Sequence, residues 1–203
     1  MFVYQGSLLD MGDPVVPDVL DQVQRFDLGD GAWLDWRPAW LPASDGWFDW
    51  AVETFPWRRS TRRMYDRIVD VPRSWCVFGD PYEAESSEQD PCPAILADLG
   101  RVLGCYYGGQ APRVAANWYQ NGNDSVAWHS DNVPDLGDAI VAIVGVGERR
   151  RFLFRPKSGG SATSFMVGRG DLLVMGGTAQ ALFEHAVPKT ASAAQRVSFM
   201  FRW

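Results

Sequence analysis

The chain has 203 residues, of which 46% are hydrophobic and ten are Trp, so it can form one well-packed domain, and disorder throughout is excluded. A net charge of −6 argues against indiscriminate nucleic-acid binding. Three widely spaced cysteines without a CxxC pair argue against a zinc ribbon or disulfide framework, and no apolar run is long enough to span a bilayer. We expect a cytoplasmic monomer with reduced thiols and without a signal peptide.

The first half of the chain is rich in Trp, Pro and acidic residues and contains few regular patterns. Short helices are expected at Asp18–Phe26 and Trp47–Thr54. Residues 56–73 form a basic strip of six Arg and two Asp, inside an otherwise acidic half. The acidic residues 80–92 predict an exposed loop, since they are polar and begin and end near Pro.

A helix is predicted directly after this loop. Pro93 suits the first helical turn, and apolar residues recur at helical spacing from Ile95 to Leu103. Gly104 is expected to end the helix, because Gly readily adopts the left-handed conformation found there.

From residue 113 onward, short apolar runs alternate with turn residues about every ten positions. This spacing is typical of an all-β barrel or a double-sheet jelly roll and unlike a parallel α/β sheet. The fold class we predict is therefore mainly β with flanking helices (α+β). The expected strands are Val114–Tyr119, Ser125–His129, Ala139–Val146, Arg151–Arg155, Ser164–Val167, Asp171–Met175, Leu182–Val187 and Arg196–Arg202.

The two histidines of the chain, His129 and His185, both fall in expected strands. Asp131 lies two residues after His129, and positions i and i+2 of a strand point to one face. Two His and one carboxylate form the facial triad of non-haem Fe(II) oxygenases. The residues alone leave two other interpretations open: ordinary surface or core histidines, and a structural zinc, although such sites usually have four protein ligands.

The final strand, residues 196–202, alternates apolar and polar side chains. If its apolar face packs under the helices of the first half, Arg196 and Arg202 point into the barrel. A buried guanidinium is costly unless paired, and no carboxylate of this strand answers it, whereas a bound dicarboxylate would. Asn117 and Tyr119 share one face of the first barrel strand and offer hydrogen bonds to the same ligand. The alternative is an edge strand with solvated Arg side chains.

Four sequence motifs, which occur in a characteristic order along the chain, resemble those of AlkB-type alkylation-repair dioxygenases, members of the Fe(II)/2-oxoglutarate-dependent oxygenase superfamily. The resemblance is strong over residues 113–203, extends weakly back to about residue 56, and is absent from residues 1–55. The motifs are NWYQNGNDSVAWHSD (117–131), GDLLVMGG (170–177), EHAVPK (184–189) and RVSFMFR (196–202).

The resemblance implies a double-stranded β-helix (jelly roll) that uses Fe(II), 2-oxoglutarate and molecular oxygen. It implies that Arg196 pairs with the distal carboxylate of 2-oxoglutarate and that Tyr119 donates a hydrogen bond to it. Arg202 and Asn117 would lie near the metal-chelating end, and Ser198 would also contact the co-substrate. The implied Fe(II) ligands are His129, Asp131 and His185.

Two departures from the family pattern concern the binding of co-substrate and base. Many members have Asn at the position of Ser198 and Thr at that of Met200, which puts the details of co-substrate binding in doubt. Many also carry an acidic residue two positions after the metal Asp, where this chain has Val133. Val cannot accept a hydrogen bond from an exocyclic amine, so the base preference is not carried over.

A target base must leave its stack to react, which requires phosphate contacts and often an apolar wedge. Alignment on Val71-Pro72-Arg73 places Met64 and Tyr65 where duplex-active relatives carry intercalating residues; ordinary packing is the alternative. A second basic cluster, residues 149–157, is expected to be partly solvated and partly in contact with phosphate. The remaining residues assigned to nucleic-acid contact are Arg62, Arg63, Arg73, Trp128 and Asn132.

Together these observations predict oxidative demethylation of N-alkylated bases in DNA, of the 1-methyladenine and 3-methylcytosine type, releasing formaldehyde and succinate. Alternatives are the same chemistry on RNA, a protein or a small molecule, or a catalytically silent jelly roll that binds metal or nucleic acid. We predict a single domain, 1–203, in which residues 1–105 form an N-terminal extension and nucleotide-recognition lid and 106–203 the jelly-roll catalytic core.

Overall fold

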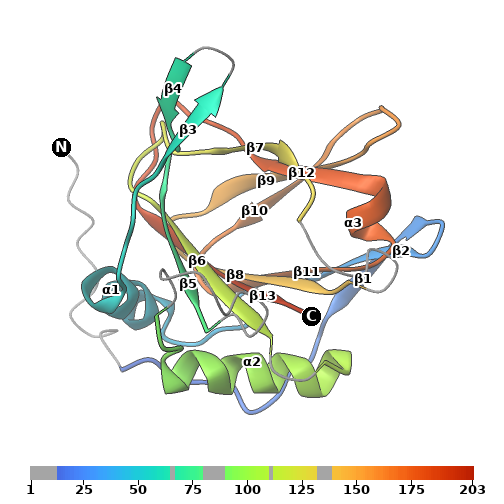
Figure 1. Ribbon diagram of the computed structural model, residues 1–203. Coiled ribbons are helices and arrows are strands. Elements are labelled where there is room, and N and C mark those ends of the chain that lie inside the picture. Colours follow the sequence, from blue (N-terminus) through green and yellow to red (C-terminus); the bar gives the residue numbers. More distant parts are fainter. Residues whose placement is uncertain (1–12, 65–66, 80–89, 110–111, 132–138) are drawn as a thin grey trace.

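The computed structural model describes residues 13–64, 67–79, 90–109, 112–131 and 139–203, with only the backbone for residues 62–64 and 67–70. Figure 1 shows two facing β-sheets, with two longer helices packed outside one of them. Pairs of neighbouring strands are antiparallel throughout the described part of the chain. This is the jelly-roll arrangement, so the predicted fold class is confirmed.

The larger sheet has seven strands in the order β1-β2-β11-β8-β13-β6-β5. Strand β13, the last in the chain, lies between β6 and β8, with Arg196 opposite Tyr119 and Gly147. The expected alternative of an edge strand is therefore wrong. The strands are β1 (Gln24–Gly29), β2 (Ala32–Arg37), β5 (Ser74–Phe78), β6 (Arg113–Tyr119), β8 (Val141–Gly147), β11 (Asp171–Gly177) and β13 (Arg196–Arg202).

The smaller sheet has four strands in the order β10-β9-β12-β7. A separate hairpin, β3-β4, carries part of the basic strip, and Thr61 pairs with Asp70 at its base. The strands are β3 (Thr61–Met64), β4 (Arg67–Asp70), β7 (Val126–His129), β9 (Arg150–Pro156), β10 (Thr163–Val167) and β12 (Phe183–Val187).

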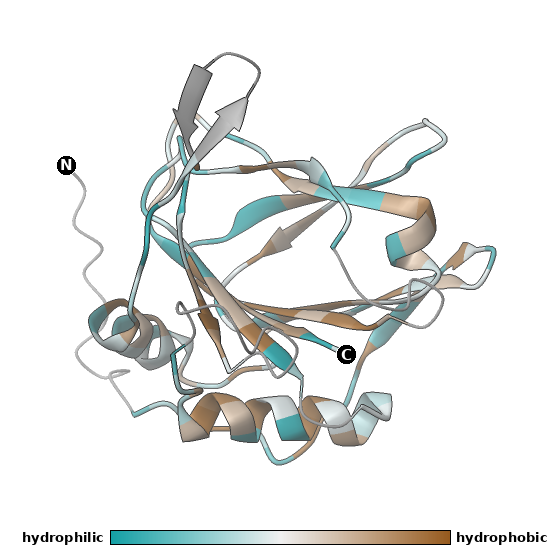
Figure 2. Ribbon diagram, viewed as in Figure 1, coloured by the Kyte–Doolittle hydropathy of each residue, from teal (hydrophilic) through white to brown (hydrophobic). Residues whose placement is uncertain are grey.

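Helices α1 (Ser44–Thr54) and α2 (Ala94–Tyr107) cover the outer face of the larger sheet (Figure 1). Trp47 of α1 and Leu99 of α2 are fully buried and belong to the same core cluster as Phe199 of β13. Figure 2 shows the apolar residues of the sheet and of these helices gathered in this layer. The apolar residues of β13 are buried against the helices, and side chains alternate between the two faces of a strand. The polar residues of β13 therefore face the space between the two sheets.

The eight strands expected after residue 113 are all present, with no end shifted by more than two residues. The helix expected at Trp47–Thr54 lies within α1. Short helix α3 (Ala179–Leu182), immediately before β12, was not predicted. Strands β1, β2 and β5 of the larger sheet come from the first half of the chain, so this sheet has strands from both sides of the predicted boundary at residue 105.

Two local predictions are wrong. The segment Asp18–Phe26 contains no helix; its last residues begin β1, which forms a hairpin with β2 through the turn at Asp30 and Gly31. Helix α2 continues past Gly104 and ends at Gly108, whose φ of 79° lies in the left-handed region that favours Gly. Most of the loop expected at residues 80–92 lies outside the described residues.

Among the described helices, none has the length and apolar character needed to cross a membrane.

Candidate active site

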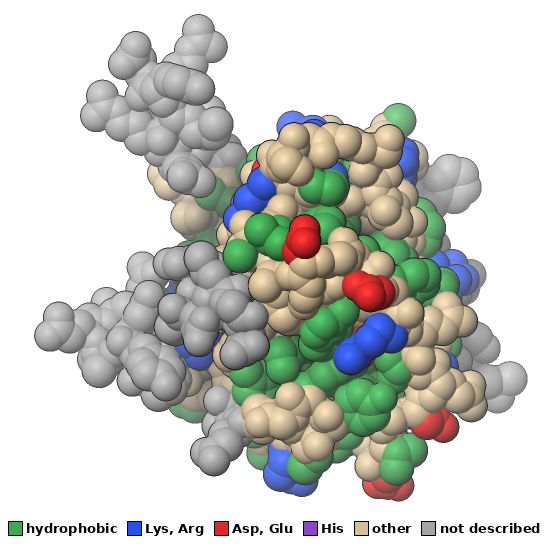
Figure 3. Space-filling view, turned by 90° about the vertical axis from the view of Figure 1, so that its right-hand side faces the viewer, with side chains coloured by type: hydrophobic (Ala, Val, Ile, Leu, Met, Phe, Trp, Pro, Cys, Tyr) green, Lys and Arg blue, Asp and Glu red, His purple; other side chains and the backbone are tan. Residues whose placement is uncertain are grey.

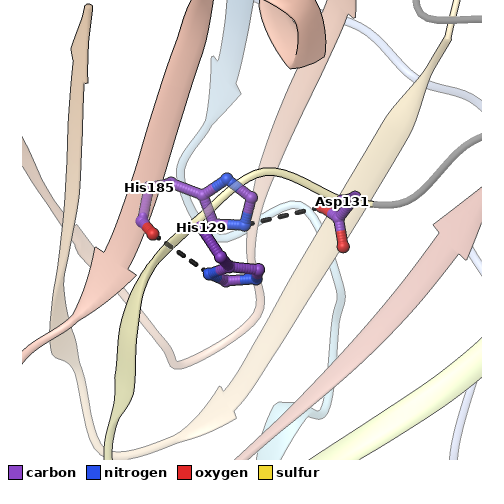
Figure 4. Close-up of side chains that lie close together, drawn as sticks. All are labelled: His129, Asp131 and His185. Carbon is purple, nitrogen blue, oxygen red and sulfur yellow. Dashed lines mark hydrogen bonds and ion pairs between the residues drawn. The ribbon is translucent and has the colours of Figure 1, made fainter. Parts of the chain in front are cut away.

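Strands β7 and β12 bring three candidate metal ligands together. His129 ends β7 and pairs with His185 of β12, and Asp131 follows two residues after His129. One ligand atom from each side chain lies within 4.8 Å of the other two, and the imidazole centroids are 4.2 Å apart (Figure 4). Two imidazoles and one carboxylate that converge in this way can hold one metal ion and leave coordination positions open.

Hydrogen bonds determine which nitrogen of His129 is available to a metal ion. Its Nδ1 lies 2.9 Å from the carbonyl oxygen of Ala127 and 3.2 Å from that of His185. A carbonyl oxygen only accepts, so Nδ1 carries the proton and Nε2 offers its lone pair. Bonds from the non-coordinating nitrogen to backbone carbonyls are a common way to orient a metal-binding His.

The surroundings hold the other two side chains in the protonation states that a metal ion requires. Burial lowers the pKa of His185 to about 4, so its imidazole is neutral at neutral pH. Burial alone would raise the pKa of Asp131, but the positive charge and hydrogen bond of Arg202, together with the neighbouring imidazoles, outweigh this effect, and the pKa lies below its usual value. Neutral His and ionised carboxylate are the metal-binding forms.

A cavity of about 230 Å³ lies between the two sheets and is bordered by all three candidate ligands. Strand β13 contributes the side chains of Arg196, Ser198, Met200 and Arg202 to its wall. Cys76 of β5 also lines the cavity, and burial raises the pKa of its thiol to about 12. The cavity thus has a candidate metal site and three lining Arg residues, two of them from β13.

Arg196 is a buried cation without a carboxylate partner among the described residues. It is 1% exposed, its Nε donates to the carbonyl oxygen of Val167 at 2.9 Å, and its guanidinium lies 5.2 Å from the ring centre of Tyr119. Its Nη1 is buried without a hydrogen-bond partner. An unsatisfied guanidinium in the same cavity as the candidate ligands fits one carboxylate of a small dicarboxylate such as 2-oxoglutarate.

Arg202 has a partner that the sequence did not indicate. Its Nη2 and Nε donate to Oδ1 of Asp131, at 2.8 and 3.1 Å. The sequence suggested a bound dicarboxylate as the partner of the inward Arg side chains; for Arg202 the structure shows a protein partner, Asp131, which lies outside β13. Its partner lies on the loop after β7, and such a pairing between distant segments is set by the fold.

Asn117 connects two parts of the cavity wall. Its Oδ1 accepts from Nε of Arg73 at 2.9 Å, and its Nδ2 donates to Sδ of Met200 at 3.3 Å. The same sulfur lies 3.7 Å from Nη2 of Arg202. Arg73, assigned from the sequence to nucleic-acid contact, thus lies within the cavity and belongs to a chain of polar contacts that ends at Asp131.

The other predicted substrate residues are described to different extents. Trp128 is half-buried on β7, and the guanidinium of Arg155 lies 3.9 Å from its ring centre. Arg62, Arg63 and Met64 belong to β3, whose side chains beyond Thr61 lie outside the description. Tyr65, Asn132 and Val133 lie outside the described residues.

The second basic cluster, residues 149–157, makes several ion pairs and hydrogen bonds within the protein, while Arg151 and Lys157 are exposed; phosphate contact by this cluster stays a prediction. Arg149 pairs with Asp171 at 2.9 Å, and Arg155 pairs with Glu184 at 2.6 Å. The face of the molecule seen in Figure 3 likewise shows basic side chains that stand apart instead of forming one continuous patch.

Arg150 belongs to this cluster by sequence but has a structural role. It is 3% exposed and donates to the carbonyl oxygens of Asn121, Asp124 and Pro188 at 2.9–3.2 Å. These contacts join the loop before β7 to the end of β12, the two strands that carry His129 and His185.

Gln180 also supports the site without having been predicted. It is 1% exposed, and its Oε1 accepts a hydrogen bond from the backbone N–H of Asp131 at 2.8 Å. Nothing in the sequence around Gln180 indicated this contact, since no helix was predicted at α3.

The chain matches the family model described as "2OG-Fe(II) oxygenase superfamily" over residues 38–202. Human "Alpha-ketoglutarate-dependent dioxygenase alkB homolog 3" is 31% identical, over 76% of this chain and 60% of the relative. The Bos taurus protein of the same name is 30% identical, over 80% and 62%. Arabidopsis thaliana "DNA oxidative demethylase ALKBH2" is 27% identical, over 88% and 68%.

The chain therefore spans about 60% of the length of the two mammalian relatives. Among solved structures, OsALKBH1 superposes with a TM-score of 0.61 at 14% identity, covering 88% of this chain and 99% of the other. An oxygenase of the same superfamily from Burkholderia pseudomallei gives 0.57 at 16%, covering 83% and 84%. At these identities the structural likeness concerns the fold.

Proposed function

Because this chain belongs to the 2OG-Fe(II) oxygenase superfamily and is of the AlkB type, we propose that it oxidatively demethylates N-alkylated bases in DNA, of the 1-methyladenine and 3-methylcytosine type. The observation that carries this proposal is the buried, unpaired guanidinium of Arg196 in the same cavity as His129, Asp131 and His185. The family's cofactors, Fe(II), 2-oxoglutarate and molecular oxygen, need both features.

When bound, Fe(II) together with 2-oxoglutarate and oxygen would supply the oxidising power needed to hydroxylate an N-methyl group. The residues of the chain hold and orient the reactants. His129, Asp131 and His185 offer one ligand atom each, and Arg202 keeps Asp131 ionised. Arg196 and Tyr119 are placed to hold the distal carboxylate of the co-substrate.

His185 and Asp131 are buried, so this part of the cavity is shielded from solvent, which would protect the oxidation from competing reactions. The hydroxylated N-methyl group would leave as formaldehyde and free the base, with succinate and carbon dioxide as the expected products of the co-substrate. Asn117 and Arg73 line the same cavity and fix its polar rim.

DNA is proposed as the substrate on two grounds. The Arabidopsis relative is named a DNA oxidative demethylase, and the basic strip of this chain runs through the β3-β4 hairpin to Arg73 at the cavity. The target base must be flipped or arrive single-stranded, since its reacting atom is inaccessible in a duplex. We also propose that the protein is a monomer in the cytoplasm. Its three cysteines are free thiols, which agrees with a reducing compartment.

The test is aerobic incubation with Fe(II), 2-oxoglutarate and oligonucleotides that carry 1-methyladenine or 3-methylcytosine, single-stranded and duplex. Mass spectrometry follows the loss of one methyl group, and His129→Ala is the inactive control. We expect methyl loss in the wild type and none in the variant.

Other outcomes distinguish the alternatives. Succinate formation without methyl loss on DNA would redirect the search to RNA, a protein or a small molecule. Neither product, with iron occupancy confirmed, would favour a silent binding module and contradict the proposal. The cost of burying Arg196 without a partner argues against a silent module.

A further inference from the structure

A second cavity, of about 560 Å³, adjoins the metal-site cavity. The two share four lining residues, which are Arg73, Val126, His129 and Val187. A ligand in the second cavity therefore lies directly beside whatever reacts at the candidate metal site. We call this second cavity the outer groove. Trp128 lines it and is the neighbour of His129 on β7, so the two side chains point to opposite faces of the strand, His129 to the inner face and Trp128 to the outer one.

Trp128 is held in a fixed orientation at the wall of the outer groove. The guanidinium of Arg155 lies over its ring at 3.9 Å from the centre. Arg155 is held in turn by Glu184 at 2.6 Å, so its charge is already compensated. An indole fixed by a cation over its face is a preorganised flat surface, which loses little conformational entropy when another flat group stacks on it.

The remaining walls of the outer groove are mostly apolar, and its charged lining residues are both cations. Arg73 and Lys189 line it together with Pro72, Leu153 and Ala186, and no carboxylate is among the described lining residues. Lys189 is exposed and forms no ion pair with any described residue. A ligand with one flat apolar face and one negative charge matches this combination, and a nucleotide has both.

Backbone hydrogen bonds hold two walls of the outer groove in place. The N–H of Ser125, just before β7, donates to the carbonyl oxygen of Pro72 at 2.7 Å. The N–H of Thr190 donates to the carbonyl oxygen of Gly122 at 2.9 Å and fixes the segment that carries Lys189. The groove is thus formed by interactions that do not depend on a ligand.

We propose that the outer groove binds the nucleotide next to the target nucleotide, with its base stacked on Trp128 and its phosphate near Lys189. The inference rests on the proposed function, since it needs a nucleic-acid chain that enters the metal site. It adds a subsite that senses whether a base is present beside the lesion. Such stacking accepts any base, because every base has a π-face.

The first experiment compares kcat/KM for short single strands with 1-methyladenine in the middle. In one set the neighbouring nucleotide, on the 5′ or the 3′ side, keeps its base; in the matched set that position is abasic. We expect the wild type to prefer the intact strand by about tenfold on one side. The preference should fall to about one in Trp128→Ala and persist in Trp128→Phe, which retains an aromatic ring.

The second experiment does not require turnover. A strand with 2-aminopurine in the neighbouring position is titrated with protein, with Mn(II) in place of iron and without oxygen. Stacking on an aromatic side chain quenches 2-aminopurine fluorescence. We expect quenching by the wild type and by Trp128→Phe, and a clear loss of quenching with Trp128→Ala at saturating protein.

Each failure has its own meaning. Equal rates on intact and abasic strands on both sides overturn the outer-groove proposal but leave the demethylase intact. If Trp128→Ala slows both sets by the same factor, Trp128 only supports the fold or the target base, and the proposal is again overturned. If no methylated strand reacts, the proposed function fails, and the quenching experiment alone decides whether the outer groove binds a base.

Discussion

Strand β13 has an Arg near each end, Arg196 and Arg202, and both side chains lie on the same face of the strand. Their surroundings differ. Arg196 is buried with an unsatisfied nitrogen, whereas Arg202 donates two hydrogen bonds to Asp131. One guanidinium is thus kept for a ligand that comes from solution, and the other stabilises a metal ligand of the protein itself. The difference teaches that an inward-pointing Arg in this strand has no role fixed by sequence alone; its neighbours in space decide it.

The strongest test of this comparison is removal of the guanidinium at the unpaired end. In Arg196→Met the KM for 2-oxoglutarate should rise about a hundredfold or more, because a buried charge-assisted contact is lost. Succinate formation at varied 2-oxoglutarate concentrations measures it, and Arg196→Lys should fall between the two. An unchanged KM would show that the unpaired guanidinium has another partner.

The matched change at the other end should act on the metal. In Arg202→Met, affinity for Fe(II) or Mn(II) should fall about 10–100-fold, because the residue that orients Asp131 is gone. The positive charge of Arg202 lowers the pKa of Asp131, so the variant should lose metal at a higher pH than the wild type as pH falls. Metal titrations at pH 7.5 and pH 6 measure both effects.

If Arg202→Met instead raised the KM for 2-oxoglutarate as much as Arg196→Met does, without a change in metal affinity, the division of roles along β13 would be wrong. The two variants therefore have to be measured in both assays.

The two substitutions, Arg196→Met and Arg202→Met, are expected to change the stability of the metal-free protein in opposite directions, and these effects are smaller. Arg196→Met should raise the free energy of unfolding by about 1–2 kcal/mol, since an unsatisfied buried cation is removed. Arg202→Met should lower it by a similar amount, about 1–2 kcal/mol, because Asp131 becomes an unpaired buried charge. Urea unfolding at pH 7 measures both.

The pH dependence of this last loss has a definite sign. Asp131 has a lowered pKa in the folded protein, so its stabilising contribution is present at neutral pH and lost as pH falls through that pKa. The difference between wild type and Arg202→Met should therefore shrink in acid. Two variants that move in the same direction at pH 7 would contradict the comparison.

The smallest effect should come from Met200, which lies between the two ends. Its sulfur accepts from Asn117 at 3.3 Å and lies 3.7 Å from Arg202. Met200→Leu keeps the volume but removes this acceptor, so kcat/KM should fall only about two- to fivefold, as expected for a weak hydrogen bond. A loss as large as that of Arg202→Met would mean that the sulfur itself positions Arg202.

Much of this arrangement could be predicted from the sequence because it rests on strand alternation. The spacing of His129 and Asp131 and the alternation of residues 196–202 each fix a face of one strand. Apolar burial under α1 and α2 then decides which face points inward. The inward face of each strand can therefore be predicted from the local sequence pattern and from the layer of helices that covers the larger sheet.

The rest depends on contacts between distant segments, which no local pattern encodes. Asp131 is hydrogen-bonded to Arg202, which lies 71 residues away in the sequence, and to Gln180, which lies 49 residues away. The segment Asp18–Phe26 was expected to be a helix, whereas pairing with β2 places its last three residues, from Gln24 on, in a strand. Arg150 looked like part of a basic surface until its three carbonyl partners were known.

Cys76 lies behind the cavity wall, with its side chain in the core between the larger sheet and the helices, and this burial protects it chemically. Burial raises the pKa of its thiol to about 12, so at neutral pH almost none is thiolate. The thiolate is the form that electrophiles and oxidants attack. By remaining protonated, this cysteine resists methylating agents and oxidants without any further shield.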